Sequence, residues 1–172
     1  MNLIFDLETD GLYNDVTQIH CLAIHDLDLG ESLVFNDQGS EQPITRGLQM
    51  LEDATNIIGH NIIGYDLPVI KKLYPWFEPT GRPIDTLLLS RLLHTDILEV
   101  DRKRKWQHMP LQLYGRHSLE SYGHRLGEYK GGFGKTTDWK EWSEDMQSYC
   151  AQDVQVTTKL WHHFLPFLTG SR

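Results

Sequence analysis

The chain has 172 residues, a formal net charge of −8, and 40% hydrophobic and 23% charged residues. This composition is typical of one globular domain, and we expect neither a membrane span nor a signal segment, because no long apolar run and no basic-then-apolar start is present. The negative charge argues against binding nucleic acid by overall electrostatic attraction. It still allows a nucleic-acid enzyme whose acids surround divalent metals.

The first half of the chain alternates between strand and helix patterns. Runs of apolar and β-branched residues predict strands at residues 2–6, 16–27, 32–35 and 56–60. Helical patterns with a proline near the first turn are found at residues 42–52 and 66–74. The segment 83–94 begins as a short strand and continues as an amphipathic helix. This order predicts the α/β class, with a mixed central sheet flanked by helices.

The second half of the chain is predicted to be mainly helical. Helices are expected from Ser118 to Leu126 and from Ser143 to Leu168. Residues 95–116 have no clean periodicity and are expected to form a long surface loop, and the glycine-rich residues 129–138 are expected to be flexible.

A basic run, Arg102–Lys105, lies next to Trp106 within the expected loop. Such a run is usually a solvated surface, but here it could also contact DNA or a partner protein. Only two cysteines are present, Cys21 and Cys150, and they form neither a CxxC metal pair nor a disulfide framework. A reducing cytoplasm is therefore the expected location.

Two acids, Asp6 and Glu8, come at the end of the first predicted strand. Residues two apart in a strand point to one face, so their carboxylates should project together and raise each other's pKa. A divalent cation such as Mg²⁺, which prefers oxygen ligands, would remove that repulsion. For an isolated pair, a plain surface role at the strand end would be the simpler interpretation.

Two further features favour a site. Asp66 follows the predicted strand at 56–60 and begins a helix, where its alternative role is that of a helix cap. Tyr149 and Asp153 are four residues apart and share one face of the last helix, although surface exposure would also explain that pair.

The acids and the tyrosine follow the order D-x-E, then N-x-x-x-Y-D, then Y-x-x-x-D. This order resembles the DEDD superfamily of 3′–5′ exonucleases, which have a ribonuclease H-like fold. It resembles in particular the subclass with a tyrosine four residues before the last aspartate. The histidine subclass would have its histidine at position 148, where this chain has Ser148.

Three longer segments are similar to the proofreading exonuclease domain of phage-type family A DNA polymerases: PIDTLLLSRLLH, HSLESYGHRLGEYKGGF and SYCAQDVQVTTKLW. The resemblance covers most of the chain and implies a single exonuclease domain over residues 1–172 without a polymerase domain. The protein would then act alone, or beside a separately encoded DNA polymerase or replication protein, in the cytoplasm of a bacterium or of a phage-infected bacterium.

The resemblance also implies a site with two divalent metal ions, Mg²⁺ or Mn²⁺. Asp6, Glu8 and Asp153 would bind the first ion, and Asp6 would bridge to the second, which Asp66 would help to position. Tyr149 would orient the attacking water through its hydroxyl, because an unperturbed tyrosine is neutral at pH 7.

Substrate contacts follow from the same resemblance. Thr9 and Leu12 would lie near the 3′-terminal nucleotide, and Asn61 and Tyr65 near the penultimate nucleotides, although ordinary packing would also explain Leu12 and Tyr65. The implied activity is hydrolysis of single-stranded DNA from the 3′ end, releasing nucleoside 5′-monophosphates. Trimming of RNA and a non-catalytic role beside a DNA polymerase are the alternatives.

Overall fold

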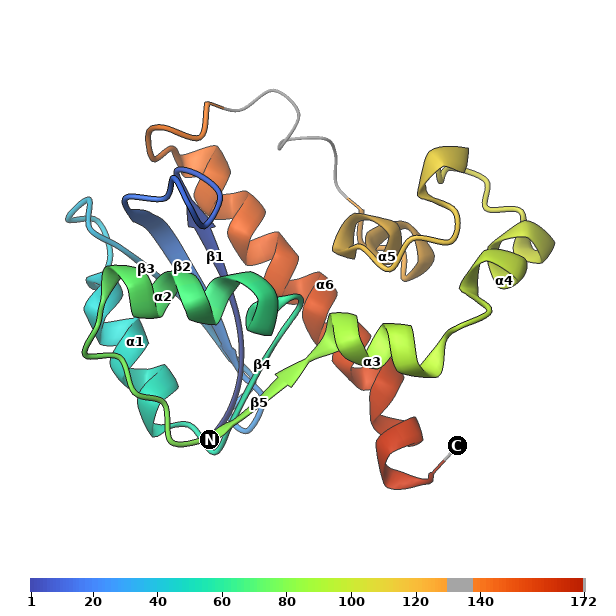
Figure 1. Cartoon of the computed structure of the whole chain (residues 1–172), viewed down its shortest axis with the longest axis horizontal. Helices are drawn as coiled ribbons and strands as arrows, with labels where there is room; N and C mark the ends of the chain where they lie inside the picture. The colour runs from blue at the N-terminus through green and yellow to red at the C-terminus, as the bar shows by residue number, and fades with distance from the viewer. Residues whose placement is uncertain (130–137, 172) are drawn as a thin grey trace.

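The computed structural model describes residues 1–129 and 138–171, and its centre is a five-stranded sheet in the order β3-β2-β1-β4-β5 (Figure 1). The strands are β1 (Asn2–Thr9), β2 (Ile19–Asp26), β3 (Glu31–Asn36), β4 (Asn56–Gly59) and β5 (Arg82–Asp85). β1 pairs antiparallel with β2, and β2 with β3, whereas β1, β4 and β5 run parallel. The sheet is therefore mixed, as the sequence predicts.

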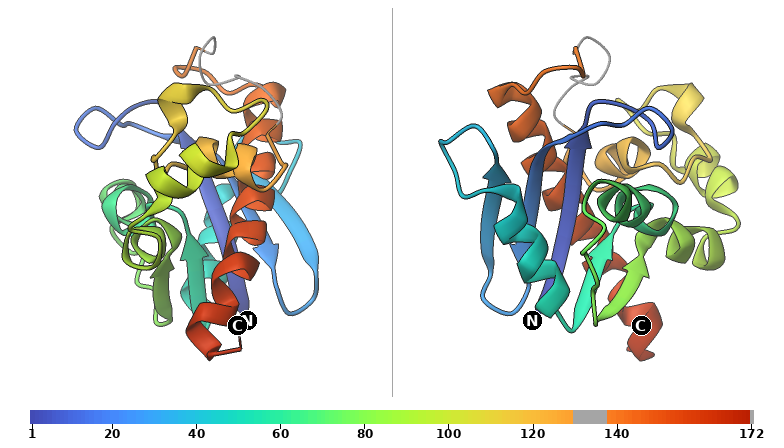
Figure 2. Two further views of the ribbon diagram at one scale, coloured as in Figure 1. Left: turned by 90° about the vertical axis from the view of Figure 1, so that its right-hand side faces the viewer. Right: turned by 60° about the vertical axis from the view of Figure 1, so that its left-hand side comes forward.

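Helices cover both faces of the sheet, as the second view of Figure 2 shows. The helices are α1 (Ile44–Asp53), the π-helical η1 (Ile62–Asp66), α2 (Leu67–Leu73), α3 (Thr86–Leu93), α4 (Ile97–Arg104), the 3₁₀ turn η2 (Leu111–Leu113), α5 (Leu119–Arg125) and α6 (Glu144–Thr169). α1 and α2 share a core with one face, and α6 shares a core with the other. The fold class predicted from the sequence is confirmed. Among the described helices, none is long and apolar enough to span a membrane.

The alternation of β1 sets the direction of the two acids. Its odd-numbered residues, such as Phe5, belong to the core beneath α1 and α2, whereas Ile4 belongs to the core beneath α6. Because side chains alternate along a strand, Asp6 and Glu8 share the face of Ile4. Both carboxylates are thereby directed towards α6.

Two predicted boundaries along the first strands are wrong. β1 continues to Thr9 instead of ending at Asp6, because its pairing with β2 runs on through Glu8 and Cys21. β2 begins at Ile19 rather than at residue 16. The two acids consequently lie within a paired strand, which restricts their backbone more than a strand end would.

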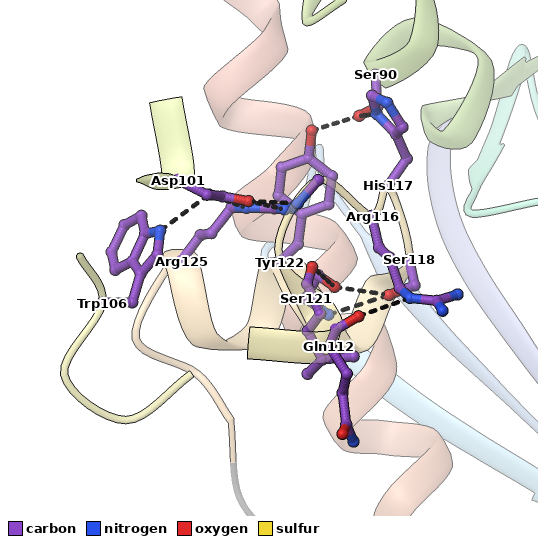
Figure 3. Close-up of polar contacts among 12 residues, drawn as sticks. Ser90, Asp101, Trp106, Gln112, Arg116, His117, Ser118, Ser121, Tyr122 and Arg125 are labelled. Carbon is purple, nitrogen blue, oxygen red and sulfur yellow. Dashed lines mark hydrogen bonds and ion pairs between the residues drawn. The ribbon is translucent and has the colours of Figure 1, made fainter. Parts of the chain in front are cut away.

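The prediction of a loop over residues 95–116 is also wrong, because this segment contains α4 and η2. Asp101 is fully buried, and its carboxylate accepts hydrogen bonds from Trp106 Nε1 at 2.9 Å and from Arg125 Nη2 at 2.7 Å (Figure 3). It also accepts one from the Gly115 N–H at 2.8 Å. These partners fold the chain back on both sides of α4. A helix without a clear apolar stripe is thus held by polar contacts made far along the chain.

We call residues 86–127, which comprise α3, α4 and α5, the helical arm. The arm packs against the second half of α6 through a separate core cluster, made of Ile97, Tyr122, Val156, Leu160 and Phe164. Figure 1 shows the arm to the right of the sheet, with α4 farthest from it.

The predicted helix starts in the second half are confirmed. The Ser118 hydroxyl accepts from the Ser121 N–H at the start of α5, and the Ser143 hydroxyl accepts from the Met146 N–H at the start of α6. Gly127, with φ of 75°, follows α5 in the left-handed region that glycine tolerates. Of the segment 129–138 that was expected to be flexible, residues 130–137 lie outside the described part of the chain.

Candidate active site

Five side chains from three elements that are distant in sequence meet at one end of the sheet. Asp6 and Glu8 come from β1, Asp66 ends η1, and Tyr149 and Asp153 lie on the first half of α6. The carboxyl of Asp153 is hydrogen-bonded to that of Asp6, and charge repulsion links Glu8 to Asp6, Asp153 and Asp66. The structure therefore brings together all the acids that the sequence motifs select.

Burial dominates the electrostatics of these four acids. It raises the pKa of Asp6 to about 7, despite hydrogen bonds from the Leu7 N–H and from Asp153 that lower it. Burial and then the charge of Asp6 raise the pKa of Glu8 to about 11, and the pKa values of Asp66 and Asp153 are raised for the same two reasons. Glu8 and Asp66 are buried and Asp6 and Asp153 half-buried, so the four carboxyls cannot all ionise together without a compensating positive charge.

The cluster fits divalent cations. Ligand atoms of Asp6, Glu8 and Cys150 lie within 4.8 Å of one another. Asp66 Oδ2 is buried and has no hydrogen-bond partner among the described residues. A buried carboxylate oxygen without a partner costs free energy, and hard cations such as Mg²⁺ and Mn²⁺ prefer oxygen ligands.

Asp66 is not a helix cap, although it precedes α2. Its backbone is already helical, and its side chain makes no capping hydrogen bond. The carboxyl instead accepts from the Leu7 N–H on β1. That N–H is accessible because the pairing between β1 and β4 ends at Ile4 and Ile58.

Asp85 holds the turn that delivers Asp66, and sequence analysis did not single it out. Its carboxylate accepts from the N–H groups of Asn61 at 2.8 Å and Ile63 at 3.0 Å, and it also caps α3 through the Leu87 N–H. Asn61 adopts the left-handed conformation with φ of 63°, and a π-helical turn follows it. The only signal in the sequence is an aspartate before a helix, which predicts the cap but not the two other contacts.

Tyr149 is placed to act through its hydroxyl group. Burial raises its pKa above the ordinary value, and the charges of Asp153, Glu8 and Asp6 raise it further. The hydroxyl therefore keeps its proton at neutral pH, where it can donate one hydrogen bond and accept another.

Cys150 lies beneath the acids and was also missed. Its Sγ donates to the backbone carbonyl of Asp6 at 3.3 Å and lies 3.9 Å from Asp6 Oδ2. Cys21 faces Glu8 across the β1–β2 ladder, and Cys21 and Cys150 are buried in the same core cluster. The position of Cys150, three residues before Asp153 on α6, is the signal that could have placed it on this side of the helix.

The predicted substrate residues fall into two groups. The Tyr65 hydroxyl lies 2.5 Å from the Thr9 hydroxyl and donates to the Gly11 carbonyl, so these two residues tie η1 to the turn after β1. Leu12 is 76% exposed, and Asn61 is also exposed. Leu12 therefore has no packing role, whereas Tyr65 packs partly against the core.

His60 connects the turn before η1 to the helical arm. Its lowered pKa predicts that the protein loses stability in acid. Its Nε2 bonds the His117 carbonyl and its Nδ1 the Thr86 hydroxyl, and burial lowers its pKa to about 4. In the unfolded chain, His60 takes up its proton near the ordinary pKa of 6.5, whereas the folded protein resists protonation down to about pH 4. The contribution of neutral His60 to the free energy of unfolding is therefore fully present above pH 6.5 and is lost as the pH falls to about 4. The loss should approach ~3 kcal/mol.

The measurement is urea unfolding at a series of pH values. His60→Gln should flatten the dependence between pH 6.5 and about 4. His162→Gln, at an exposed position on α6, is the matched control. Equal slopes for wild type and His60→Gln would contradict the prediction.

Comparisons with known proteins agree with this arrangement. The RNase H superfamily model matches residues 3–127. The DNA-directed DNA polymerases of Escherichia phage T7 and Enterobacteria phage T3 are 30% and 32% identical over 190 aligned positions, which cover 92% of this chain. The chain spans about a quarter of the length of these polymerases, at 26%.

Solved structures share the fold at low sequence identity. Brucella melitensis NrnC is 20% identical, with a TM-score of 0.65, and the match covers 99% of this chain and 76% of NrnC. The zinc-bound complex of E. coli ExoI with single-stranded DNA is 16% identical, with a TM-score of 0.58, and covers 98% of this chain and 41% of ExoI. The chain therefore belongs to the RNase H superfamily, as a DEDD exonuclease-type domain related to the DNA polymerases of phages T7 and T3.

Proposed function

We propose that the protein is a metal-dependent 3′–5′ exonuclease that shortens single-stranded DNA and releases nucleoside 5′-monophosphates. The observation that carries this proposal is the cluster of four buried or half-buried carboxyls with raised pKa values, one of which has an oxygen without a partner among the described residues. Such a cluster is unstable as anions alone and suits two divalent cations. The relationship to phage DNA polymerases favours DNA as the substrate.

Asp6, Glu8 and Asp153 would hold one cation, and Asp6 and Asp66 the other, with Mg²⁺ or Mn²⁺ as the expected ions. When bound, these ions supply the positive charge that promotes ionisation of water and stabilises a departing 3′ oxygen. Asp6 would be the central ligand, because its carboxyl is hydrogen-bonded to that of Asp153 and lies close enough to Asp66 for its charge to raise the pKa of Asp66.

The remaining residues orient the reactants. The protonated Tyr149 hydroxyl would align the water whose oxygen forms the new bond to phosphorus while the bond to the 3′ oxygen breaks. The exposed Leu12 would press against the terminal base, and Thr9 would lie close to the same 3′-terminal nucleotide. Asn61 and Tyr65 would contact the next nucleotides, and contacts of this kind tolerate any base sequence.

We further propose that residues 1–172 act as a single exonuclease domain. It would serve DNA proofreading or DNA degradation, with a DNA polymerase or replication protein as its partner. NrnC has been solved with bound Mg²⁺ and with pGG, and ExoI with single-stranded DNA, which makes metal use and oligonucleotide binding reasonable expectations for this fold.

The test is product analysis of single-stranded and duplex oligonucleotides labelled at either end. With Mg²⁺ or Mn²⁺, a 5′-labelled single strand should give a ladder of products shortened from the 3′ end, and a 3′-labelled strand should release labelled mononucleotide at once. Matched RNA strands measure the preference for deoxyribose. Shortening that persists with excess chelator, or products shortened from the 5′ end, would contradict the proposal.

Mn²⁺ should raise the melting temperature of the protein in the absence of any substrate. A ligand that binds only the folded state adds about 2.7 kcal/mol at 100 times its Kd. For a domain of this size that corresponds to a rise of roughly 5–10 °C. Differential scanning fluorimetry with and without chelator measures the shift, and Asp66→Asn should reduce it because Asp66 has the oxygen without a partner.

A further inference from the structure

Charge is unevenly divided between the helical arm and the rest of the molecule. Residues 86–127 contain seven Lys and Arg against four Asp and Glu, a net charge of +3. The rest of the chain contains nine Lys and Arg against twenty Asp and Glu, a net charge of −11. The arm is therefore basic on a protein that is otherwise strongly acidic.

The basic residues of the arm are available to an external ligand. All except Arg125 are exposed: Arg91, Arg102, Lys103, Arg104, Lys105 and Arg116. Four of them are consecutive, Arg102–Lys105, and none of these four forms an ion pair with a described residue. A run of uncompensated like charges on an ordered surface is suited to an anionic partner.

The run is held in a defined position. Asp101 anchors the end of α4 to Arg125 and to the Gly115 backbone, and it also binds Trp106. The Arg104 guanidinium lies 4.8 Å from the centre of the Trp106 ring. Lys105 ends the helix in the left-handed conformation, with φ of 52°. Cations fixed in this way lose less freedom on binding than cations of a disordered loop.

We propose that the helical arm binds the phosphate backbone of the substrate strand, on the 5′ side of the nucleotides that enter the acidic site. This inference rests on the proposed function and adds to it a second contact region for longer substrates. The arm packs on the second half of α6, and the first half of the same helix carries Tyr149 and Asp153. A strand leaving the acids would therefore continue along α6 to the arm, and Figure 1 shows this helix between the sheet and the arm.

Polynucleotide fits this surface better than a protein partner. Exposed apolar side chains are also present on the arm, such as Leu92 at 75% and Leu111 at 79%, but an apolar partner would leave the four cations Arg102–Lys105 without the ion pairs that they lack among the described residues. A protein with a net charge of −8 does not attract DNA through its overall charge. A basic region beside the acidic site would supply the local attraction for the phosphates of the strand. The charge division thus explains how an acidic protein could hold DNA.

The test compares two double variants that change the net charge equally. Arg102→Ala/Lys103→Ala removes two cations from α4 and leaves Arg104 on Trp106. Arg46→Ala/Arg82→Ala removes two exposed cations from α1 and β5, outside the arm. All proteins also carry Asp6→Asn, so that binding of a fluorescent single strand of about 20 nucleotides is measured by anisotropy without cleavage.

The arm variant should have a weaker salt dependence. Each phosphate neutralised on a single strand contributes about 0.7 to the slope of log K against log salt, so losing two contacts lowers the slope by about 1.4. Between roughly 50 and 200 mM salt, the control variant should lose about sevenfold more affinity than the arm variant does. A dinucleotide, which cannot reach the arm, should bind both variants equally.

Equal salt slopes for the two double variants would overturn the proposal, whether or not the arm variant also changes its oligomeric state. Binding in the Asp6→Asn background does not depend on hydrolysis. Failure of the proposed exonuclease activity, seen as an uncleaved dinucleotide and an uncleaved long strand with the wild-type protein, is therefore distinguishable from failure of the arm to bind.

Discussion

Asp6→Asn should abolish 3′–5′ hydrolysis while making the metal-free protein more stable. Substitutions of residues that only hydrogen-bond to metal ligands lower metal affinity or activity by about 10–100-fold. The loss of a carboxylate that would contact both cations should exceed about 100-fold in the rate of product release. Asparagine has the same shape, so the fold should be retained.

The gain in stability follows from the raised pKa of Asp6. The pKa of Asp6 is about 7 in the folded protein, against an ordinary pKa of 3.8 in the unfolded chain, so the folded state resists ionisation and stability falls as the pH rises through this range. Asparagine cannot ionise. It should therefore raise the free energy of unfolding above pH 7 by more than about 1 kcal/mol, and the gain should disappear as the pH falls towards 3.8.

The measurements are end-labelled cleavage assays and urea unfolding with chelator present. Asp53→Asn, an exposed acid at the end of α1, is the matched control and should change neither quantity. Asp6→Asn protein that still cleaves at the wild-type rate would remove the basis for the proposed metal site.

The main elements of this site could be predicted because they depend on local patterns. Alternation along β1 directs Asp6 and Glu8 together, and the spacing of Tyr149 and Asp153 on α6 places both on one helix face. Asp66 could be predicted as part of the same motif order. The first two inferences need only residues that are close in sequence, whereas the inference for Asp66 depends on the order of motifs along the whole chain.

The parts that sequence analysis missed depend on long-range contacts. α4 is ordered by a bond between Asp101 and Arg125, which are 24 residues apart, so its own periodicity was uninformative. Asp85 has a second role only because β4 and β5 are neighbours in the sheet. The raised pKa values likewise arise from the burial of acids contributed by separate elements.

Removal of the Asp101 carboxylate should be the most destabilising single change in the helical arm. Hydrogen bonds from Arg125, Gly115 and Trp106 outweigh the effect of burial and hold the pKa of Asp101 below its usual value. Asp101→Ala leaves Arg125 as a buried charge without its partner and deprives the Trp106 and Gly115 donors of their acceptor. Breaking a buried ion pair in this way costs about 3–5 kcal/mol.

Urea unfolding of three variants separates the charge effect from the loss of the arm's anchor. Asp101→Ala should lower the free energy of unfolding by most of this cost of about 3–5 kcal/mol. Asp96 is an exposed acid before α4 that makes no capping hydrogen bond, so Asp96→Ala should lower it little. Replacing both partners, Asp101→Leu with Arg125→Met, should recover part of the loss because no buried charge remains. The recovery should be incomplete, since the Gly115 N–H and Trp106 Nε1 still lack an acceptor. A loss below about 1 kcal/mol for Asp101→Ala would show that the arm is held by its apolar contacts with α6 and not by Asp101.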